Sequence, residues 1–403
     1  LMVIDQGSMI WNNEADLQGG GMVNFDSTAT IEGSTFLENR ATGGSSGEAS
    51  VGGGVYNRVG EVYISSSTID SNVAATLETM DQLGRGGGIA NSGGVVEITG
   101  TDIRSNFADN GCGGILNEDG STLTVEGGAL AQNETEAGGG GLCNLVSSTT
   151  MTDTTVTLNT AEGSGGAIQG FDNSIISLTR CMISGNKALD GNGGGIYQAL
   201  GELRIAESTL LTNYAGHSGG GTYTVHGTTN ITGTTFYGNA AADILMGGMS
   251  LNHGGAMFLL FGETHVVNST ISGNRASEDG GGIYGDGALV SLSFTTVANN
   301  VADDDGDGNG DGGGLFDGVA NPRIVNAILA GNVDKGGEAN NCGGLGVIAY
   351  GDNIIKDRGC TIDPGSTGTL YNADPLLGPL ADNGGETDTH ALSAGSPAID
   401  RVT

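Results

Sequence analysis

A glycine-rich motif recurs along most of the chain and constrains its fold more than any other feature of the sequence. Eleven copies run from GGGMVN through GGGVYN, GGGIAN and GGGIYG to GGGLFD, and an aliphatic residue follows the glycines in most of them. A second motif, in which Ser or Thr and an apolar residue precede an Asn, lies between the copies. Its asparagines are spaced mostly by 26 or 27 residues, with four longer intervals, and are Asn39, Asn72, Asn106, Asn133, Asn159, Asn186, Asn213, Asn239, Asn274, Asn300 and Asn332.

Each period also contains short stretches in which apolar and polar residues alternate, such as Val62–Ile64 and Leu203–Ile205. Alternation over a few residues predicts β-strands, and no segment has a helical period. The chain is therefore predicted to be all-β. We expect a right-handed parallel β-helix of about 11–12 coils, with 26–27 residues and three short strands in each coil. Stacking of the coils would join the asparagines into a hydrogen-bonded ladder.

The period also divides the chain into two predicted parts. Residues 1–334 form the array of coils, and residues 335–403 form a C-terminal coil and cap. Asn13 lies 26 residues before Asn39, so the array begins in mid-coil and we expect further sequence before Leu1.

Charge narrows the choice of partners. The chain has 46 Asp and Glu against 13 Lys and Arg, a net charge of −33. Binding of nucleic acid needs clustered basic residues, so this charge argues against a nucleic-acid partner. The net negative charge would also repel polyanionic substrates. No apolar run approaches the length of a membrane span, so no transmembrane segment is predicted.

Four insertions lengthen the same corner of the coil, at residues 42–51, 75–85, 242–252 and 303–312. Insertions at one corner of a solenoid project on one side, which is often the binding side. The alternative is that this corner simply tolerates extra length.

The fourth insertion predicts a Ca²⁺ site. Asp303, Asp305 and Asp307 alternate before a glycine, as in the first half of an EF-hand loop. Asn309 and Asp311 would supply further oxygens. The bidentate Glu expected at the twelfth position is replaced by Gly314, so a merely solvated acidic loop is the alternative.

An aromatic stripe is predicted on one outer face. Residues that follow the inward aliphatic position should point outward. Five consecutive coils have an aromatic residue there, namely Tyr197, Tyr223, Phe258, Tyr284 and Phe316. Such a stripe suits a glycan or a protein partner, and the alternative is stacking between coils.

The five cysteines cannot all pair. Cys342 and Cys360 flank a segment beyond the regular coils and are the predicted disulfide, which fits an extracellular compartment. Cys112, Cys143 and Cys181 occupy different coil positions and are predicted to be thiols. Three sequons predict glycosylation at Asn133, Asn230 and Asn268.

The C-terminal sequence adds a resemblance to a known family. The segment DPLLGPLADNGGETDTHALSAGSPAID (374–400) resembles the terminal signature of choice-of-anchor Q surface proteins, and the segment from Cys342 to Cys360 resembles the part that precedes it. The glycine and Asn motifs resemble polymorphic outer-membrane-protein repeats. These resemblances imply a secreted or surface-displayed β-helix. The tail is expected to cover the last coil.

These features favour a secreted or cell-surface β-helix with a structural or adhesive role. It would be stabilised by Ca²⁺ and would bind an extracellular glycan or surface protein through the stripe or the inserted loops. No catalytic constellation is found, so no catalytic residue is assigned. A polysaccharide hydrolase or lyase with its active site in the insertions, and a self-assembling subunit of an extracellular filament, remain as alternatives.

Overall fold

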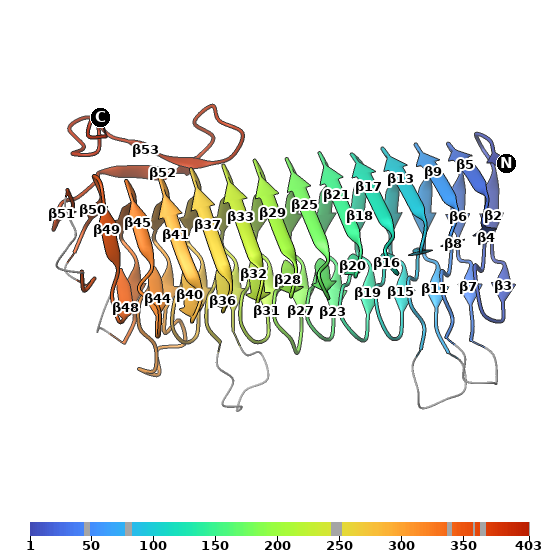
Figure 1. Ribbon diagram of the computed structural model, residues 1–403, viewed down its shortest axis with the longest axis horizontal. Helices are drawn as coiled ribbons and strands as arrows, with labels where there is room; N and C mark the ends of the chain where they lie inside the picture. The colour runs from blue at the N-terminus through green and yellow to red at the C-terminus, as the bar shows by residue number, and fades with distance from the viewer. Residues whose placement is uncertain are drawn as a thin grey trace. The chain divides into compact units, whose positions relative to one another are not determined.

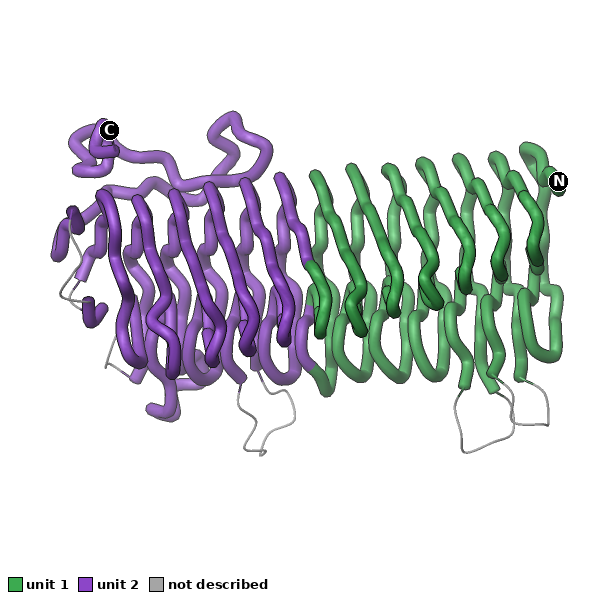
Figure 2. Tube along the Cα trace, in the orientation of Figure 1, with its two compact units in different colours: residues 1–191, 195–202 green, residues 192–194, 203–403 purple. Residues whose placement is uncertain are grey.

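The computed structural model describes the chain except for residues 44–48, 77–82, 243–251, 337–340, 358, 363–367 and 403. The described residues form two compact units, shown in Figure 2. Unit 1 contains residues 1–191 and 195–202, and unit 2 contains residues 192–194 and 203–403.

Both units are parallel β-helices built from four sheets, here numbered I to IV, as Figure 1 shows. The predicted fold class is confirmed, because strands from successive coils pair in parallel in every sheet. From the first coil to the one that contains β47 (Val333–Asp334), each coil contains a fourth strand that the sequence did not predict. It has two residues and directly follows the ladder asparagine, as in β7 (Arg40–Ala41), which is too short for alternation to be visible.

The strands of unit 1 follow the same order in each coil. Sheet I contains β1 (Met2–Ile4), β5 (Thr28–Glu32), β9 (Glu61–Ser65), β13 (Val95–Thr99), β17 (Thr122–Glu126), β21 (Ser148–Thr152) and β25 (Ile175–Thr179). Sheet II contains β2 (Met9–Trp11), β6 (Thr35–Leu37), β10 (Thr68–Asp70), β14 (Asp102–Arg104), β18 (Ala129–Ala131), β22 (Thr155–Thr157) and β26 (Met182–Ser184). Sheet III contains β3 (Glu14–Ala15), β7, β11 (Val73–Ala74), β15 (Phe107–Ala108), β19 (Glu134–Thr135), β23 (Thr160–Ala161) and β27 (Lys187–Ala188). Sheet IV contains β4 (Met22–Phe25), β8 (Val55–Arg58), β12 (Ile89–Ser92), β16 (Ile115–Glu118), β20 (Leu142–Leu145), β24 (Ile168–Phe171) and β28 (Ile196–Ala199).

Unit 2 repeats this order after β29 (Glu202–Ala206). Sheet I contains β33 (Thr228–Thr232), β37 (Glu263–Val267), β41 (Leu289–Ser293), β45 (Arg323–Val325) and β49 (Ile348–Tyr350). Sheet II contains β30 (Thr209–Leu211), β34 (Thr235–Tyr237), β38 (Thr270–Ser272), β42 (Thr296–Ala298), β46 (Ile328–Ala330), β50 (Ile354–Ile355) and β51 (Leu370–Tyr371). Sheet III contains β31 (Tyr214–Ala215), β35 (Ala240–Ala241), β39 (Arg275–Ala276), β43 (Val301–Ala302) and β47 (Val333–Asp334). Sheet IV contains β32 (Thr222–Val225), β36 (Met257–Leu260), β40 (Ile283–Asp286), β44 (Leu315–Asp317) and β48 (Cys342–Gly344).

The glycine motif allows sheets III and IV to approach each other closely. A Cβ atom on Gly53 would lie 2.4 Å from the carbonyl oxygen of Gly87 in the next coil and 2.5 Å from the backbone of Val73. No side chain fits at such distances, so the position requires glycine. The facing strands have a small inward residue for the same reason, as at Ala41 and Ala74, both fully buried.

The predicted asparagine ladder is present in both units. In unit 1 each amide donates to the next coil, as from Asn106 Nδ2 to Asn133 Oδ1 at 2.9 Å. In unit 2 the bond from Asn274 to Asn300 has the same length. The sequence also contains a second ladder that was missed. It joins sheets IV and I in unit 1 through Asn24, Asn57, Asn91, Asn117 and Asn144, the last letters of the first five glycine motifs.

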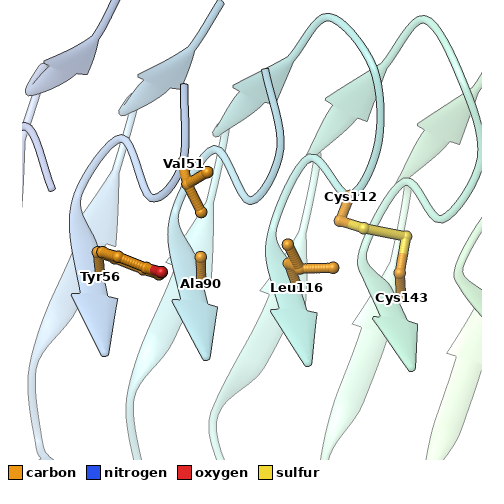
Figure 3. Close-up of a cluster of buried hydrophobic side chains, with 6 residues drawn as sticks. All are labelled: Val51, Tyr56, Ala90, Cys112, Leu116 and Cys143. Atoms are coloured by element: carbon orange, nitrogen blue, oxygen red, sulfur yellow. A yellow bond between two sulfur atoms is a disulfide. The ribbon is translucent and has the colours of Figure 1, made fainter. Parts of the chain in front are cut away.

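Two disulfides are present among the described residues. One joins Cys342 and Cys360, the pair expected from the sequence. The other joins Cys112 and Cys143, so the prediction that these two are thiols is wrong. Cys112 lies in the loop before β16 with a positive φ of 63°, and this loop lies over the outer face of sheet IV, where Cys143 projects from β20 (Figure 3). Cys181 is a buried thiol, as predicted.

The C-terminal hairpin lies along the coils, whereas the sequence predicted that the tail would cover the last coil. Strands β52 (Leu377–Ala381) and β53 (Thr389–Leu392) form an antiparallel hairpin along the outer face of sheet II in unit 2 (Figure 1). We call residues 374–400 the strap. Thr235 Oγ1 donates to the carbonyl oxygen of Asp388 at 2.6 Å, and Ser272 Oγ lies 2.9 Å from His390 Nε2.

The face under the strap is made of small, uncharged side chains. Thr270, Ser272 and Ala298 occupy outward positions of sheet II in unit 2 and are buried. The outward residues Asp102 and Arg104 in unit 1 are exposed. Because the covered side chains are short, the hairpin can lie close to this face.

Candidate functional site

Four aromatic rings of unit 2 form a continuous stack on the outer face of sheet IV. We call Tyr223, Phe258, Tyr284 and Phe316 the aromatic stack. Their neighbouring centroids are 4.5, 4.9 and 5.2 Å apart and their planes differ by at most 13°. The strand register produces this arrangement, because these residues are direct partners on β32, β36, β40 and β44. Tyr197 belongs to unit 1, where its ring lies 5.2 Å from that of Phe171 at 51°.

This geometry covers the ring faces. Because the rings are parallel, each inner ring is sandwiched by its neighbours, and Phe258 is only 8% exposed. A sugar ring packs against an aromatic face, and the faces of the inner rings Phe258 and Tyr284 are covered by their neighbours. The arrangement favours stacking between coils as the main role of these rings.

His253 lies on the stack and links it to the fourth insertion. Its ring lies 4.3 Å from that of Tyr284, nearly parallel to it. Its Nδ1 accepts a hydrogen bond from the backbone N–H of Asp279 at 3.1 Å. Burial lowers the pKa of His253 to about 4, so the ring is neutral at neutral pH. The neutral form also suits an Nδ1 atom that acts as an acceptor.

The fourth insertion brings together part of the predicted metal site. Carboxylate oxygens of Asp303, Asp305 and Asp307 all lie within 4.8 Å of one another. Asn309 donates to Asp307 through its Nδ2 at 2.9 Å. Asp311 instead interacts with the preceding coil, where its N–H donates to Asp279 Oδ1 at 2.9 Å. The first three residues thus form a cluster, and Asp311 belongs to the base of the stack.

Negative charge accumulates at this corner. Burial and then the charges of Asp307, Asp279, Asp305 and Asp303 raise the pKa of Glu278 to about 7. Burial, with a smaller contribution from Asp311, raises the pKa of Asp279 to about 6. We call Glu278, Asp279, Asp303, Asp305 and Asp307 the acidic corner. The cations beside it contact Asp304, with Lys335 Nζ at 2.6 Å and Arg275 Nη1 at 3.7 Å.

The second insertion is held at its base in unit 1. Asp109 accepts hydrogen bonds from the backbone N–H groups of Thr76 at 2.7 Å and Gly84 at 2.5 Å. Arg85 then forms an ion pair with Glu118 at 2.8 Å. The central residues of the first three insertions lie outside the described residues. The structure therefore locates the predicted binding side only by the residues at the two ends of each insertion.

These corner segments cover a small outer core in unit 1. Figure 3 shows outward residues of sheet IV meeting side chains from the segments before the glycines. The cluster contains Val51, Tyr56, Ala90, Cys112, Leu116 and Cys143. From Tyr56 to Cys143, the outward row in unit 1 is therefore a buried apolar seam.

The three predicted glycosylation sites differ in the solvent exposure of their asparagine side chains. Asn133 is fully buried in the first ladder and donates to Asn159 Oδ1 at 3.0 Å, so the prediction of a glycan there is wrong for the folded chain. The reason is that the sequon coincides with the ladder motif. Asn230 is partly exposed on β33, and Asn268 is exposed in the turn after β37.

Comparison with known protein families gives a match that falls within one coil. Residues 268–286 match the Chlamydia polymorphic membrane protein repeat, and the predicted resemblance to such repeats is confirmed there. No curated protein and no solved structure matches the chain. None of the described residues forms a helix long and apolar enough to cross a membrane. The matched residues contain β38, β39 and β40, so the similarity falls on one coil of the β-helix that carries Asn274 of the ladder and Tyr284 of the stack.

Proposed function

We propose that this chain is a structural and adhesive β-helix of a cell surface. The observation that carries the proposal is the match of residues 268–286, which contain three strands of one coil, to a polymorphic membrane protein repeat within a laddered parallel β-helix. Two disulfides support an oxidising, extracellular location, where such bonds persist. The resemblance of residues 374–400 to choice-of-anchor Q proteins supports surface attachment, and remains a prediction.

The adhesive contact is proposed for the corner-loop side of the molecule. The insertions fall in the sequence between the strands of sheet III and those of sheet IV, and Tyr284 lies near Asp279 of the acidic corner. A partner for this side would be a surface protein that presents basic side chains, since the chain has a net charge of −33. The ladders and disulfides would hold the loops on a stiff support.

Surface display can be tested by labelling cells of the native host with antibodies raised against the purified chain. We expect labelling of intact cells that is removed by external protease, with no further increase after permeabilisation. Labelling that requires permeabilisation would contradict the proposal. An antibody against a cytoplasmic protein serves as the control for membrane integrity.

We also propose that Ca²⁺ binds Asp303, Asp305 and Asp307. Two oxygens on opposite sides of a Ca²⁺ ion are separated by about 5 Å, which suits the spacing of these carboxylates. Burial raises the pKa of Glu278, and the charges of the neighbouring Asp residues raise it further, a repulsion that a cation would relieve.

The calcium proposal is tested by thermal unfolding with excess CaCl₂ and with EDTA. The parent chain should melt at a lower temperature in EDTA, and a variant with Asp303, Asp305 and Asp307 changed to Asn should not respond. The control carries Asp→Asn at the exposed residues Asp5, Asp26 and Asp119 and should keep the full response. An equal response in both variants would place the cation elsewhere, and no response in the parent would exclude calcium stabilisation.

A further inference from the structure

Sheet I of unit 2 contains a notch beside β41. Strands β37 and β41 pair over five residues, from Glu263↔Leu289 to Val267↔Ser293. Strand β45 has only three residues, and its first pair with β41 is Ser291↔Arg323. Leu289 and Val290 therefore have no paired residue in β45.

The local sequence explains the notch. Pro322, directly before β45, has no N–H to donate to a neighbouring strand. Asp317 Oδ1 accepts the N–H groups of Val319 at 2.9 Å and Ala320 at 2.6 Å, which stabilises a turn before Pro322. The chain reaches β45 through this turn instead of extending the sheet.

The notch forms a surface pocket of about 270 Å³. Its side chains come from three successive coils and are Glu263, His265, Leu289, Ser291, Asn321 and Arg323. The register explains the convergence, because His265, Ser291 and Arg323 are direct partners on β37, β41 and β45 and occupy outward positions.

The polar groups of this pocket are available to a ligand. Among the described residues, no hydrogen bond or ion pair engages the side chains of Ser291, Asn321 or Arg323. Glu263 lies 3.8 Å from His265, and both side chains are about half exposed. Arg323 differs in this respect from Arg85 and Arg104, whose guanidinium groups pair with carboxylates.

The chemistry of the pocket selects for hydroxyl groups. The carboxylate of Glu263 offers hydrogen-bond acceptors and the guanidinium of Arg323 offers donors, from the strands on either side of β41. Their charges cancel. The hydroxyl of Ser291 and the amide of Asn321 lie near the exposed Leu289, which can contact the apolar face of a sugar ring. A polyanionic glycan would meet the repulsion of a chain with a charge of −33. We propose that this pocket binds a neutral sugar unit of a glycan.

The inference deepens the proposed adhesive function by naming a ligand class and a site, and it places the glycan contact on sheet I instead of the aromatic stack. Its test needs only the purified full chain. Failure of surface labelling would leave the sugar pocket standing, and failure of sugar binding would leave surface display standing.

The experiment is saturation-transfer NMR and calorimetry with laminarihexaose, cellohexaose and mannohexaose as neutral probes and hexagalacturonate as the anionic probe. At least one neutral probe should bind, and hexagalacturonate should bind more weakly. Arg323→Ala should weaken neutral binding by about tenfold or more, because it removes a charged donor. Arg40→Ala, at an exposed arginine of unit 1, is the matched control and should bind like the parent.

The proposal is overturned if no neutral probe binds, if hexagalacturonate binds more tightly, or if Arg323→Ala binds like the parent. Melting temperatures of both arginine variants show whether each remains folded. Ser291→Trp, which fills the pocket without removing a charge, provides the second test if Arg323→Ala unfolds. Unchanged binding in that variant overturns the proposal as well.

Discussion

At the scale of single residues, the first ladder engages every polar atom of its asparagine side chains. Asn159 Nδ2 donates to Asn186 Oδ1 at 2.9 Å and to the carbonyl oxygen of Leu130 at 3.0 Å. Its Oδ1 accepts from both the N–H and the Nδ2 of Asn133 at 3.0 Å. One side chain thus joins three coils, and its loss leaves several buried groups without partners.

Asn159→Ala should therefore be strongly destabilising. An unsatisfied buried polar group costs about 1–3 kcal/mol, and we expect a total loss of roughly 3–5 kcal/mol in the free energy of unfolding. Urea unfolding followed by circular dichroism measures it. Asn230→Ala, on the outward side of β33, is the control and should change stability by less than about 0.5 kcal/mol. Equal effects would show that the ladder bonds contribute little.

His253 predicts a pH dependence. Its folded pKa is about 4 because of burial, below the ordinary value of 6.5. The unfolded chain therefore binds a proton between pH 6.5 and 4 that the folded chain does not, so this residue lowers stability as the pH falls through that range. His253→Phe, which keeps a ring on Tyr284, should reduce the loss in melting temperature between pH 6.5 and 4.5. An unchanged slope would assign the acid sensitivity to other groups.

At the scale of elements, the strap depends on the small outward side chains of sheet II. Ala298 is fully buried at an outward position of β42, whereas Ala131 at the equivalent position of β18 is partly exposed. Ala298→Lys should displace the strap, because a long charged side chain cannot be buried there without a partner.

Hydrogen exchange and limited proteolysis measure this displacement. In Ala298→Lys, residues 377–392 should lose protection and become sites of cleavage. Ala131→Lys should leave both observables unchanged. A protected hairpin in the first variant would mean that the strap is held mainly by its contacts at Thr235 and Ser272.

The elements also show how far the sequence alone could go. The period of the ladder motif predicted the stacked coils, because each inward residue repeats at the same position in every coil. The second ladder has a signal in the sequence, because the first five glycine motifs all end in Asn. It was missed because the sixth motif ends in Gly170, which interrupts the repeat. The two-residue strands, the Cys112–Cys143 bond and the strap could not be inferred, because each depends on a loop path that leaves no periodic signal.

The candidate site was predicted in part for similar reasons. Asp303, Asp305 and Asp307 are close in sequence and remain close in space. The aromatic residues were placed correctly on one outer row, but whether their faces are open depends on ring orientation, which strand register does not determine. The pocket at Arg323 was missed because it arises from an interruption of the repeat at Pro322.

At the scale of the whole molecule, the charge of −33 predicts a stabilising effect of salt. Exposed carboxylates repel one another in the folded chain, and the screening length falls from about 30 Å at 0.01 M salt to about 10 Å at 0.1 M. The melting temperature should therefore rise over this range of NaCl at pH 7.5 in the presence of EDTA. A fall would indicate that ion pairs such as Arg180–Asp153 outweigh the repulsion.

The Cys112–Cys143 bond has a consequence for a chain that is pulled. The cysteines are 31 residues apart, in adjacent coils of unit 1. An extended chain spans about 3.4 Å per residue, so the bond keeps roughly 100 Å of contour length from being released when the strands separate. In a single-molecule stretching experiment, reduction of the disulfides should lengthen the unravelled chain by at least that amount. A protein held at a surface under flow would then extend by a shorter length under force than its number of coils suggests. It would also have fewer residues to refold when the force falls.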